Sequence, residues 1–197
     1  MFAGDELLTY LRHKLEYGIG WMVSLLHRAG VTPNMLTAAG FLAAASSGII
    51  FAWRTSQALT FILAPSLILL SGFFDVIDGS LARVSGRTTK LGGVLDSIFD
   101  RLGEIFIISG MTIGGFSQVI WGLGAVSSSL MVSYARARVE VEGLRLEGVG
   151  VAERPERILI LSFSTFLGYI EYGVIAVFIL ATVTVAQRII YAHKHLY

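Results

Sequence analysis

The chain contains four long stretches with almost no charge, and these constrain its fold more than any other feature. They are Met35 to Trp53, Thr55 to Phe74, Ile105 to Ala135, and Ile158 to Gln187, in which Glu171 is the one charged residue. A helix of about 20 apolar residues crosses the roughly 30 Å hydrocarbon core of a bilayer. Only 15% of the residues are charged, against about a quarter in soluble domains. The sequence therefore predicts an integral membrane protein.

Each of the two longest stretches contains a turn signal and is predicted to form two helices. Gly114 to Gln118 divides the first stretch, and the segment from Gly168 to Gly173, which holds the glutamate, divides the second. A further helix is expected to start near Leu91, and Pro65 is expected to kink the helix before it. The predicted fold class is all-α, with six transmembrane helices in one domain at residues 31–197.

Residues 1–30 are predicted to form a juxtamembrane amphipathic segment ahead of this domain. Charged side chains interrupt them, so they lack the continuous apolar core of a signal peptide. Their apolar side chains recur at helical spacing, at Leu7, Leu8, Leu11, Leu15, Ile19, Met22 and Leu26. This pattern predicts an interfacial helix lying on the membrane surface, and a helix packed against the bundle fits it equally well.

The basic residues predict how the chain is oriented in a cell membrane. If the N-terminus is cytoplasmic, all but one of the 15 Lys and Arg residues face the cytoplasm, the exception being Arg54. This distribution follows the positive-inside rule, so both termini and the two charged loops of this multi-pass protein are expected to be cytoplasmic. The net charge of +1 gives no field for binding nucleic acid, and the absence of cysteine excludes disulfides and thiolate chemistry.

Four aspartates lie close together in the sequence, at the ends of two adjacent predicted helices. Asp75 and Asp78 are three residues apart, and Asp96 and Asp100 are four apart, so each pair shares one face of its helix. The short basic link from Arg83 to Lys90 is expected to make the two helices antiparallel neighbours. The four carboxylates are then predicted to converge at the inner membrane interface, where charge is costly and functional by default.

Four carboxylates at such a separation repel one another unless cations neutralise them. Oxygen ligands favour hard cations such as Mg²⁺, Mn²⁺ or Ca²⁺, and a metal pair bridged by carboxylates assists displacement at phosphorus. Gly79, Gly92 and Gly93 leave room for a bulky ligand beside these carboxylates, and Arg83 supplies a cation for a phosphate. Two alternatives remain: simple ion pairs with the nearby basic residues, and the ion site of a transporter.

The segment from Asp75 to Asp100 resembles the signature of the CDP-alcohol phosphotransferase family. The family pattern is D-x2-D-G-x2-A-R-x8-G-x3-D-x3-D, and this sequence fills every fixed position. The resemblance extends from about Val31 to Arg188. It implies six transmembrane helices, a homodimer and a cytoplasm-facing site in each protomer. There a diacylglycerol- or archaeol-phosphate group passes from a CDP-linked lipid to an alcohol, and CMP is released.

The resemblance also implies a role for each signature residue. Asp75, Asp78 and Asp96 hold two Mg²⁺ ions, for which Mn²⁺ can substitute, and Asp100 lies close to a metal and is the general base. Such a base is needed because a sugar hydroxyl is a poor nucleophile at neutral pH. The pocket for the CDP-linked lipid is implied to contain Asp75, Asp78, Gly79, Ala82, Arg83, Gly92 and Asp96.

Arginines at the cytoplasmic ends of the later helices indicate a phosphorylated acceptor, because a guanidinium matches phosphate oxygens bidentately. The sequence around them resembles the phosphatidylinositol-phosphate synthase branch of the family, which includes archaetidylinositol-phosphate synthases. In that branch three basic positions hold the phosphate of myo-inositol phosphate, and they correspond to Arg136, Arg157 and Arg188. Arg136 stands where bacterial members often carry lysine.

Three functions are compatible with the sequence at this point. The first is synthesis of an inositol-phosphate phospholipid. The second is a sibling enzyme that uses glycerol 3-phosphate or another alcohol, or CDP-inositol as donor. The third is an ion or metal transporter. Three further arginines fit either acceptor binding or ordinary anchoring at the inner membrane surface: Arg138, Arg145 and Arg154.

Overall fold

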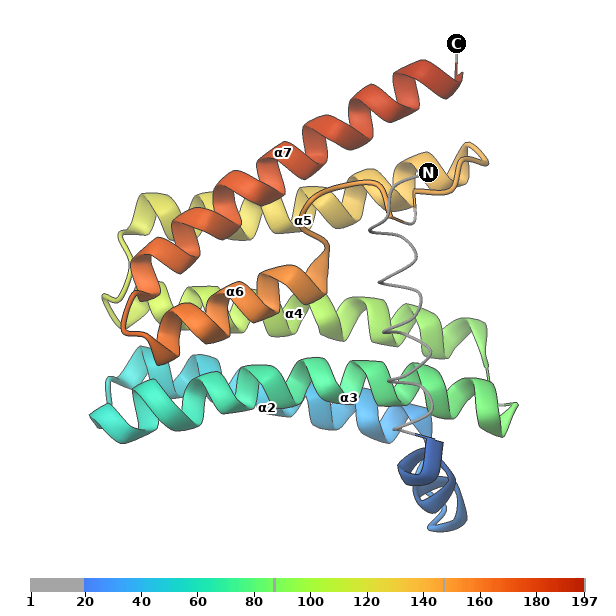
Figure 1. Ribbon diagram of the computed structural model, residues 1–197, viewed down its shortest axis with the longest axis horizontal. Coiled ribbons are helices and arrows are strands. Elements are labelled where there is room, and N and C mark those ends of the chain that lie inside the picture. The colour runs from blue at the N-terminus through green and yellow to red at the C-terminus, as the bar shows by residue number, and fades with distance from the viewer. Residues whose placement is uncertain (1–19, 87, 147, 197) are drawn as a thin grey trace.

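The computed structural model describes residues 20–86, 88–146 and 148–196, and within these ranges the chain is helical with no strand. Its elements are α2 (Pro33–Trp53), the short π-helix η1 (Leu59–Leu63), α3 (Ala64–Ser85), α4 (Lys90–Ile113), α5 (Val119–Val141), α6 (Arg154–Phe166) and α7 (Ile170–Leu196). The all-α prediction is confirmed for these residues. The turns expected within the two longest apolar stretches separate α4 from α5 and α6 from α7 (Figure 1).

Three helical segments of the described chain are long and apolar enough to cross a membrane. They are Pro33–Trp53, Leu59–Ser85 and Ile170–Leu196. Helix α6 has only 13 residues, fewer than the roughly 20 that a full crossing needs. It is short because the loop from α5 runs back along the bundle before α6 begins, as Figure 1 shows. The structure thus supports a protein with several membrane-spanning helices.

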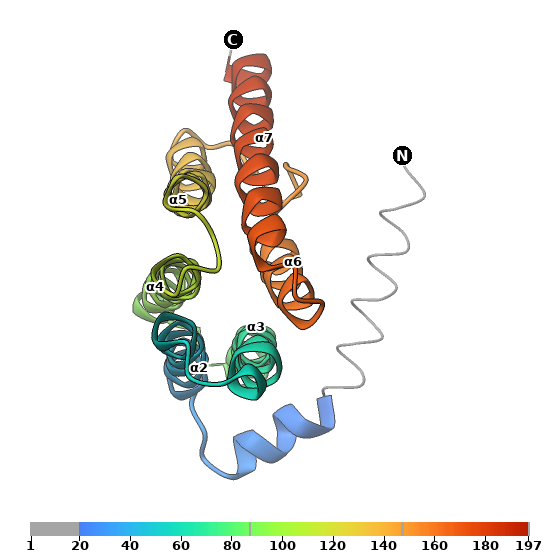
Figure 2. The ribbon, with the colours of Figure 1, turned by 90° about the vertical axis from the view of Figure 1, so that its left-hand side faces the viewer.

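Helix α2 is the platform on which the aspartate-bearing helices pack. Both α3 and α4 pack mainly against α2, whereas α7 packs against α5 and α6 (Figure 2). Small residues allow the close approach of α2 and α4: a Cβ on Gly48 would overlap with the backbone of Phe106, and one on Gly110 would overlap with the backbone of Gly48. The prediction that α3 and α4 are direct antiparallel neighbours is therefore not met in the described residues, because each helix packs mainly on α2 rather than on the other.

The predicted kink at Pro65 takes the form of a π-helical turn just before it. Proline lacks an N–H and crowds the carbonyl one turn earlier. In η1 the backbone N–H of Ala64 donates to the carbonyl of Leu59, five residues back. This wider turn lets the helix continue through Pro65, so η1 and α3 form one apolar segment.

Only the end of the predicted N-terminal helix falls within the described residues. Residues 20–28 are helical, and Val23 is buried against Leu36 of α2 and against Ile77 and Leu81 of α3. This part of the segment packs against the bundle, as the alternative prediction expects. The rest of the predicted interfacial helix, residues 1–19, lies outside the described residues.

Candidate metal and substrate site

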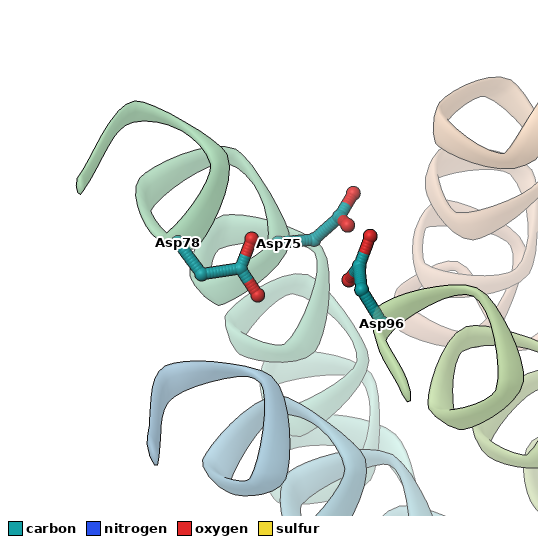
Figure 3. A group of neighbouring side chains, drawn as sticks. All are labelled: Asp75, Asp78 and Asp96. Carbon is teal, nitrogen blue, oxygen red and sulfur yellow. The ribbon is translucent and has the colours of Figure 1, made fainter. Parts of the chain in front are cut away.

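The four signature aspartates approach a common region from two helices. Carboxylate oxygens of Asp75 and Asp78, on α3, and of Asp96, on α4, lie within 4.8 Å of one another. Figure 3 shows these three side chains turned toward a shared space. Asp100, also on α4, joins them through Arg154, because one guanidinium nitrogen is 2.9 Å from an oxygen of Asp100 and 2.9 Å from an oxygen of Asp75. The predicted convergence of the carboxylates is present.

Caps at both ends of the α3–α4 link fix where the two pairs of aspartates lie. Gly86 follows the last residue of α3 as its C-cap, and its φ of 62° lies in the left-handed region that favours glycine. Thr89 precedes α4 as its N-cap, and its hydroxyl accepts a hydrogen bond of 2.9 Å from the N–H of Gly92. A link this short holds the two pairs at the same end of the bundle, so their side chains meet.

The arrangement of these oxygens fits divalent cations. Asp78 is 5% exposed, and one of its oxygens accepts a hydrogen bond of 2.7 Å from the hydroxyl of Thr37 on α2. Oδ1 of Asp96 is buried without a hydrogen-bond partner. A buried carboxylate oxygen in that state is costly, and a cation would satisfy it. Ligands that are all carboxylate oxygens select hard cations such as Mg²⁺ or Mn²⁺.

Two cavities meet at the carboxylates. The larger has a volume of about 400 Å³ and is lined by Asp75, Asp96 and Asp100 together with residues of α5, α6 and α7. The smaller has a volume of about 270 Å³ and lies between α2, the end of α3 and the start of α4. Asp96 lines both cavities. A group bound in one cavity can therefore meet a group bound in the other at the carboxylates.

The smaller cavity brings together most of the residues assigned by the signature to the CDP-linked lipid. They are Asp78, Gly79, Ala82, Arg83, Gly92 and Asp96, whereas Asp75 lines the larger cavity. Sequence reasoning missed the contribution of α2, which adds Pro33, Asn34 and Thr37 to this wall. The available signal was the cluster of polar residues that opens the first apolar stretch.

The larger cavity is lined by all three arginines predicted to bind the acceptor phosphate. Arg136 donates from Nε to Glu140 at 2.8 Å, one helical turn away on α5. Arg157 is 2% exposed. Two of its nitrogens donate to Glu104 of α4 at 2.6 and 2.8 Å, and a third donates to the carbonyl of Ala152 at 2.9 Å. Arg157 therefore links α6 to α4 as well as lining the cavity.

Arg188 of α7 is also 2% exposed and hydrogen-bonded on three sides. It donates to the carbonyl of Val132 on α5 at 2.6 Å, to the carbonyl of Val149 at 2.9 Å and to the carboxylate of Glu153 at 2.9 Å. Sequence reasoning did not foresee these acidic and carbonyl partners. For Glu104 a signal existed, because it follows Asp96 and Asp100 at the same helical spacing.

Arg154 lies at the carboxylates, with its side chain 16% exposed. The sequence left open that the aspartates simply form ion pairs with nearby basic residues. Ion pairs are present at Asp75 and Asp100, but their partner is Arg154 of α6. Among the basic residues that the sequence placed nearby, Arg101 approaches Asp100 at 3.8 Å. Sequence reasoning left Arg154 undecided between an acceptor role and a surface anchor.

Comparison with known proteins places the chain among phospholipid-synthesising enzymes. The family model described as CDP-alcohol phosphatidyltransferase matches residues 30–190. The archaetidylinositol phosphate synthase of Pyrococcus horikoshii is 35% identical over 192 residues, which cover 96% of this chain and 98% of that relative. The archaetidylinositol phosphate synthase of Methanothermobacter thermautotrophicus is 40% identical over 175 residues, which cover 86% of this chain and 87% of that relative.

Solved structures of the phosphatidylinositol phosphate synthase of Mycobacterium tuberculosis have a similar fold at 26% identity. The structure with CDP-DAG bound has a TM-score of 0.74 and covers 87% of this chain and 91% of that one. The structure in complex with manganese and citrate has a TM-score of 0.76 and covers 88% of each chain. These matches extend over most of the chain and include the helices that bring the signature aspartates together. The chain therefore belongs to the CDP-alcohol phosphatidyltransferase family of enzymes.

Proposed function

We propose that this protein synthesises an inositol-phosphate phospholipid. It transfers a diacylglycerol- or archaeol-phosphate group from a CDP-linked lipid to myo-inositol phosphate and releases CMP. The observation that carries the proposal is the pair of cavities that meet at the carboxylates, one lined by the signature residues and the other by three arginines. The names of the archaetidylinositol phosphate and phosphatidylinositol phosphate synthases that resemble it support the choice of acceptor.

The four aspartates are proposed to hold two divalent cations, either Mg²⁺ or Mn²⁺. The close approach of Asp75, Asp78 and Asp96 supports this, as does the unpartnered buried oxygen of Asp96. A related enzyme has been solved in complex with manganese. When bound, such ions stabilise the negative charge that develops on the β-phosphate and on the departing CMP.

Asp100 is proposed to be the general base. It lines the larger cavity beside the arginines, so it can accept the proton of an acceptor hydroxyl held there. The hydroxyl oxygen then attacks the β-phosphorus in line, the bond from that phosphorus to the CMP oxygen breaks, and the lipid phosphate becomes joined to the head group. A positioned carboxylate of this kind contributes about 10²–10⁴-fold to a rate.

The remaining residues are proposed to hold the two substrates. The nucleotide diphosphate occupies the smaller cavity, where glycines let it approach the backbone and Arg83 offers positive charge. In the larger cavity, the acceptor phosphate contacts Arg136, whose side chain is 38% exposed. Arg157 and Arg188, which are buried in the cavity wall, contribute charge and further hydrogen bonds.

We further propose that α2 to α7 cross a cell membrane six times, with both termini and the site on the cytoplasmic side. The charged residues at one end of the bundle and the three long apolar segments support this. Residues 1–30 are proposed as a juxtamembrane segment and residues 31–197 as the transmembrane domain, and two protomers are proposed to form a homodimer, as the family resemblance implies.

The proposal is tested by supplying radiolabelled CDP-linked lipid and Mg²⁺ to the purified protein with a panel of acceptors. We expect CMP release and a labelled phospholipid with myo-inositol phosphate, and at least about tenfold less product with free inositol or glycerol 3-phosphate. Equal turnover with glycerol 3-phosphate would contradict the acceptor assignment. A product made only when CDP-inositol replaces the CDP-linked lipid would reverse the roles of donor and acceptor.

The substitution Asp100→Asn is expected to slow turnover by about 10²-fold or more, because the amide cannot accept the proton of the hydroxyl. The variant should keep its affinity for the CDP-linked lipid, which isothermal titration measures. Glu142→Gln is the matched control, because it removes a carboxylate from the exposed end of α5 and should leave turnover unchanged. Near-normal activity of Asp100→Asn would rule out its role as base.

The substitution Arg136→Gln is expected to raise KM for inositol phosphate by about tenfold or more, because one charge-assisted hydrogen bond to the phosphate is lost. The KM for the CDP-linked lipid should stay the same. Arg138→Gln is the matched control: it removes a guanidinium two residues away that ion-pairs with Glu142 and does not line the larger cavity. An equal rise in KM for the control would show that the positive charge of the surface, and not a contact with Arg136, sets the affinity for inositol phosphate.

A further inference from the structure

Arg154 places a cation between carboxylates that come from two other helices. It is the first residue of α6, and its Nη1 atom is 2.9 Å from Oδ2 of Asp75 and 2.9 Å from Oδ1 of Asp100. Its Nε atom is buried without a hydrogen-bond partner. The guanidinium thus neutralises the acidic cluster through Nη1 while its buried Nε–H has no hydrogen-bond partner.

The backbone that carries Arg154 is fixed by contacts on both sides of it. The residue before it, Glu153, pairs with Arg188 of α7 at 2.9 Å, and Arg157 one turn later pairs with Glu104 of α4 at 2.6 Å. The preceding loop is tied to α7 by a hydrogen bond of 3.1 Å from the N–H of Ala152 to Thr184. Any change of partner at Arg154 therefore has to come from its side chain.

A guanidinium and a divalent ion compete for the negative charge of the same carboxylates. The nitrogen of Arg154 bridges Asp75 and Asp100, and both belong to the set proposed to ligate the metals. A Mg²⁺ ion held by these carboxylates at about 2.1 Å would neutralise them itself, so the guanidinium of Arg154 would lose most of its attraction to Asp75 and Asp100. The side chain has a place to go, because it borders the cavity that Arg136, Arg157 and Arg188 also line.

We propose that Arg154 is an internal counter-ion that exchanges with the divalent cations, an inference that rests on the proposed metal site. In the metal-free enzyme it neutralises Asp75 and Asp100. When cations bind, it leaves these carboxylates and turns its guanidinium into the larger cavity, where it adds positive charge for the acceptor phosphate. Metal and acceptor then favour each other's binding, because both favour the released position of Arg154.

The test measures Mn²⁺ affinity by electron paramagnetic resonance of the purified enzyme without substrates. Arg154→Gln is expected to bind Mn²⁺ about tenfold tighter or more, because the cation no longer displaces a charge-assisted partner. Arg154→Ala gives the same comparison with a smaller side chain. Arg154→Lys should stay within about threefold of the wild type, since its ammonium still competes.

Arg101→Gln is the matched control for the loss of one positive charge near the site. Arg101 also lines the larger cavity and lies 3.8 Å from Asp100, so a field effect alone would tighten Mn²⁺ binding as much as Arg154→Gln does. We expect a change below about threefold for this control. Unchanged or weaker Mn²⁺ binding by Arg154→Gln and Arg154→Ala, or equal tightening by Arg101→Gln, would overturn the inference.

The double variant Asp75→Asn with Asp96→Asn separates this inference from the proposed function. It should abolish Mn²⁺ binding, because it removes ligands from both helices. If it binds Mn²⁺ like the wild type, the metal site itself is wrong. If it loses Mn²⁺ while Arg154→Gln binds no tighter than the wild type, the metal site stands and only the exchange of Arg154 fails.

Discussion

Carboxylates this close together need positive charge between them, and the rest of the site follows from that need. Three aspartates bring oxygens within 4.8 Å of one another. At that separation two unit charges repel by about 3 kcal/mol when the effective dielectric constant is about 20. The chain provides one cation of its own at Asp75 and Asp100, through Arg154, and the proposed metal ions provide the others. Arg154 and the metal ions can act in this way only because α3 and α4 present their carboxylates to the same space.

The scaffold meets this requirement with one platform helix and two buried ionic links. Glycines on α2 and α4 let those helices approach closely, and Thr37 of α2 orients Asp78. The Arg157–Glu104 pair is almost fully buried, and so is the side chain of Arg188, whose partner Glu153 is 30% exposed. Buried ion pairs are costly unless their geometry is good, and here three guanidinium nitrogens of each arginine are hydrogen-bonded. They fix the start of α6 beside the aspartates and in the wall of the larger cavity.

The sequence predicted the helical fold and the aspartate cluster because both depend on local spacing. Apolar runs set the helices, and offsets of three and four residues place each aspartate pair on one face. The partners of the arginines depend on how α4, α5, α6 and α7 approach one another, which no local pattern encodes. The loop before α6 shows this most clearly: by running back along the bundle it shortens α6 and delivers Arg154 to Asp75 and Asp100. The charge pattern alone left Arg154 undecided between binding the acceptor and anchoring the chain at the inner surface.

The aspartates of α3 and α4 are proposed to hold two divalent ions where the two cavities meet. Anomalous diffraction from crystals grown with Mn²⁺ and a CDP-linked lipid tests it most directly. We expect two manganese peaks about 3.5–4 Å apart, ligated by Asp75, Asp78, Asp96 and Asp100, with Arg154 turned away from Asp75. Absence of manganese at these four carboxylates at saturating concentration, with CDP-linked lipid bound elsewhere, would contradict it.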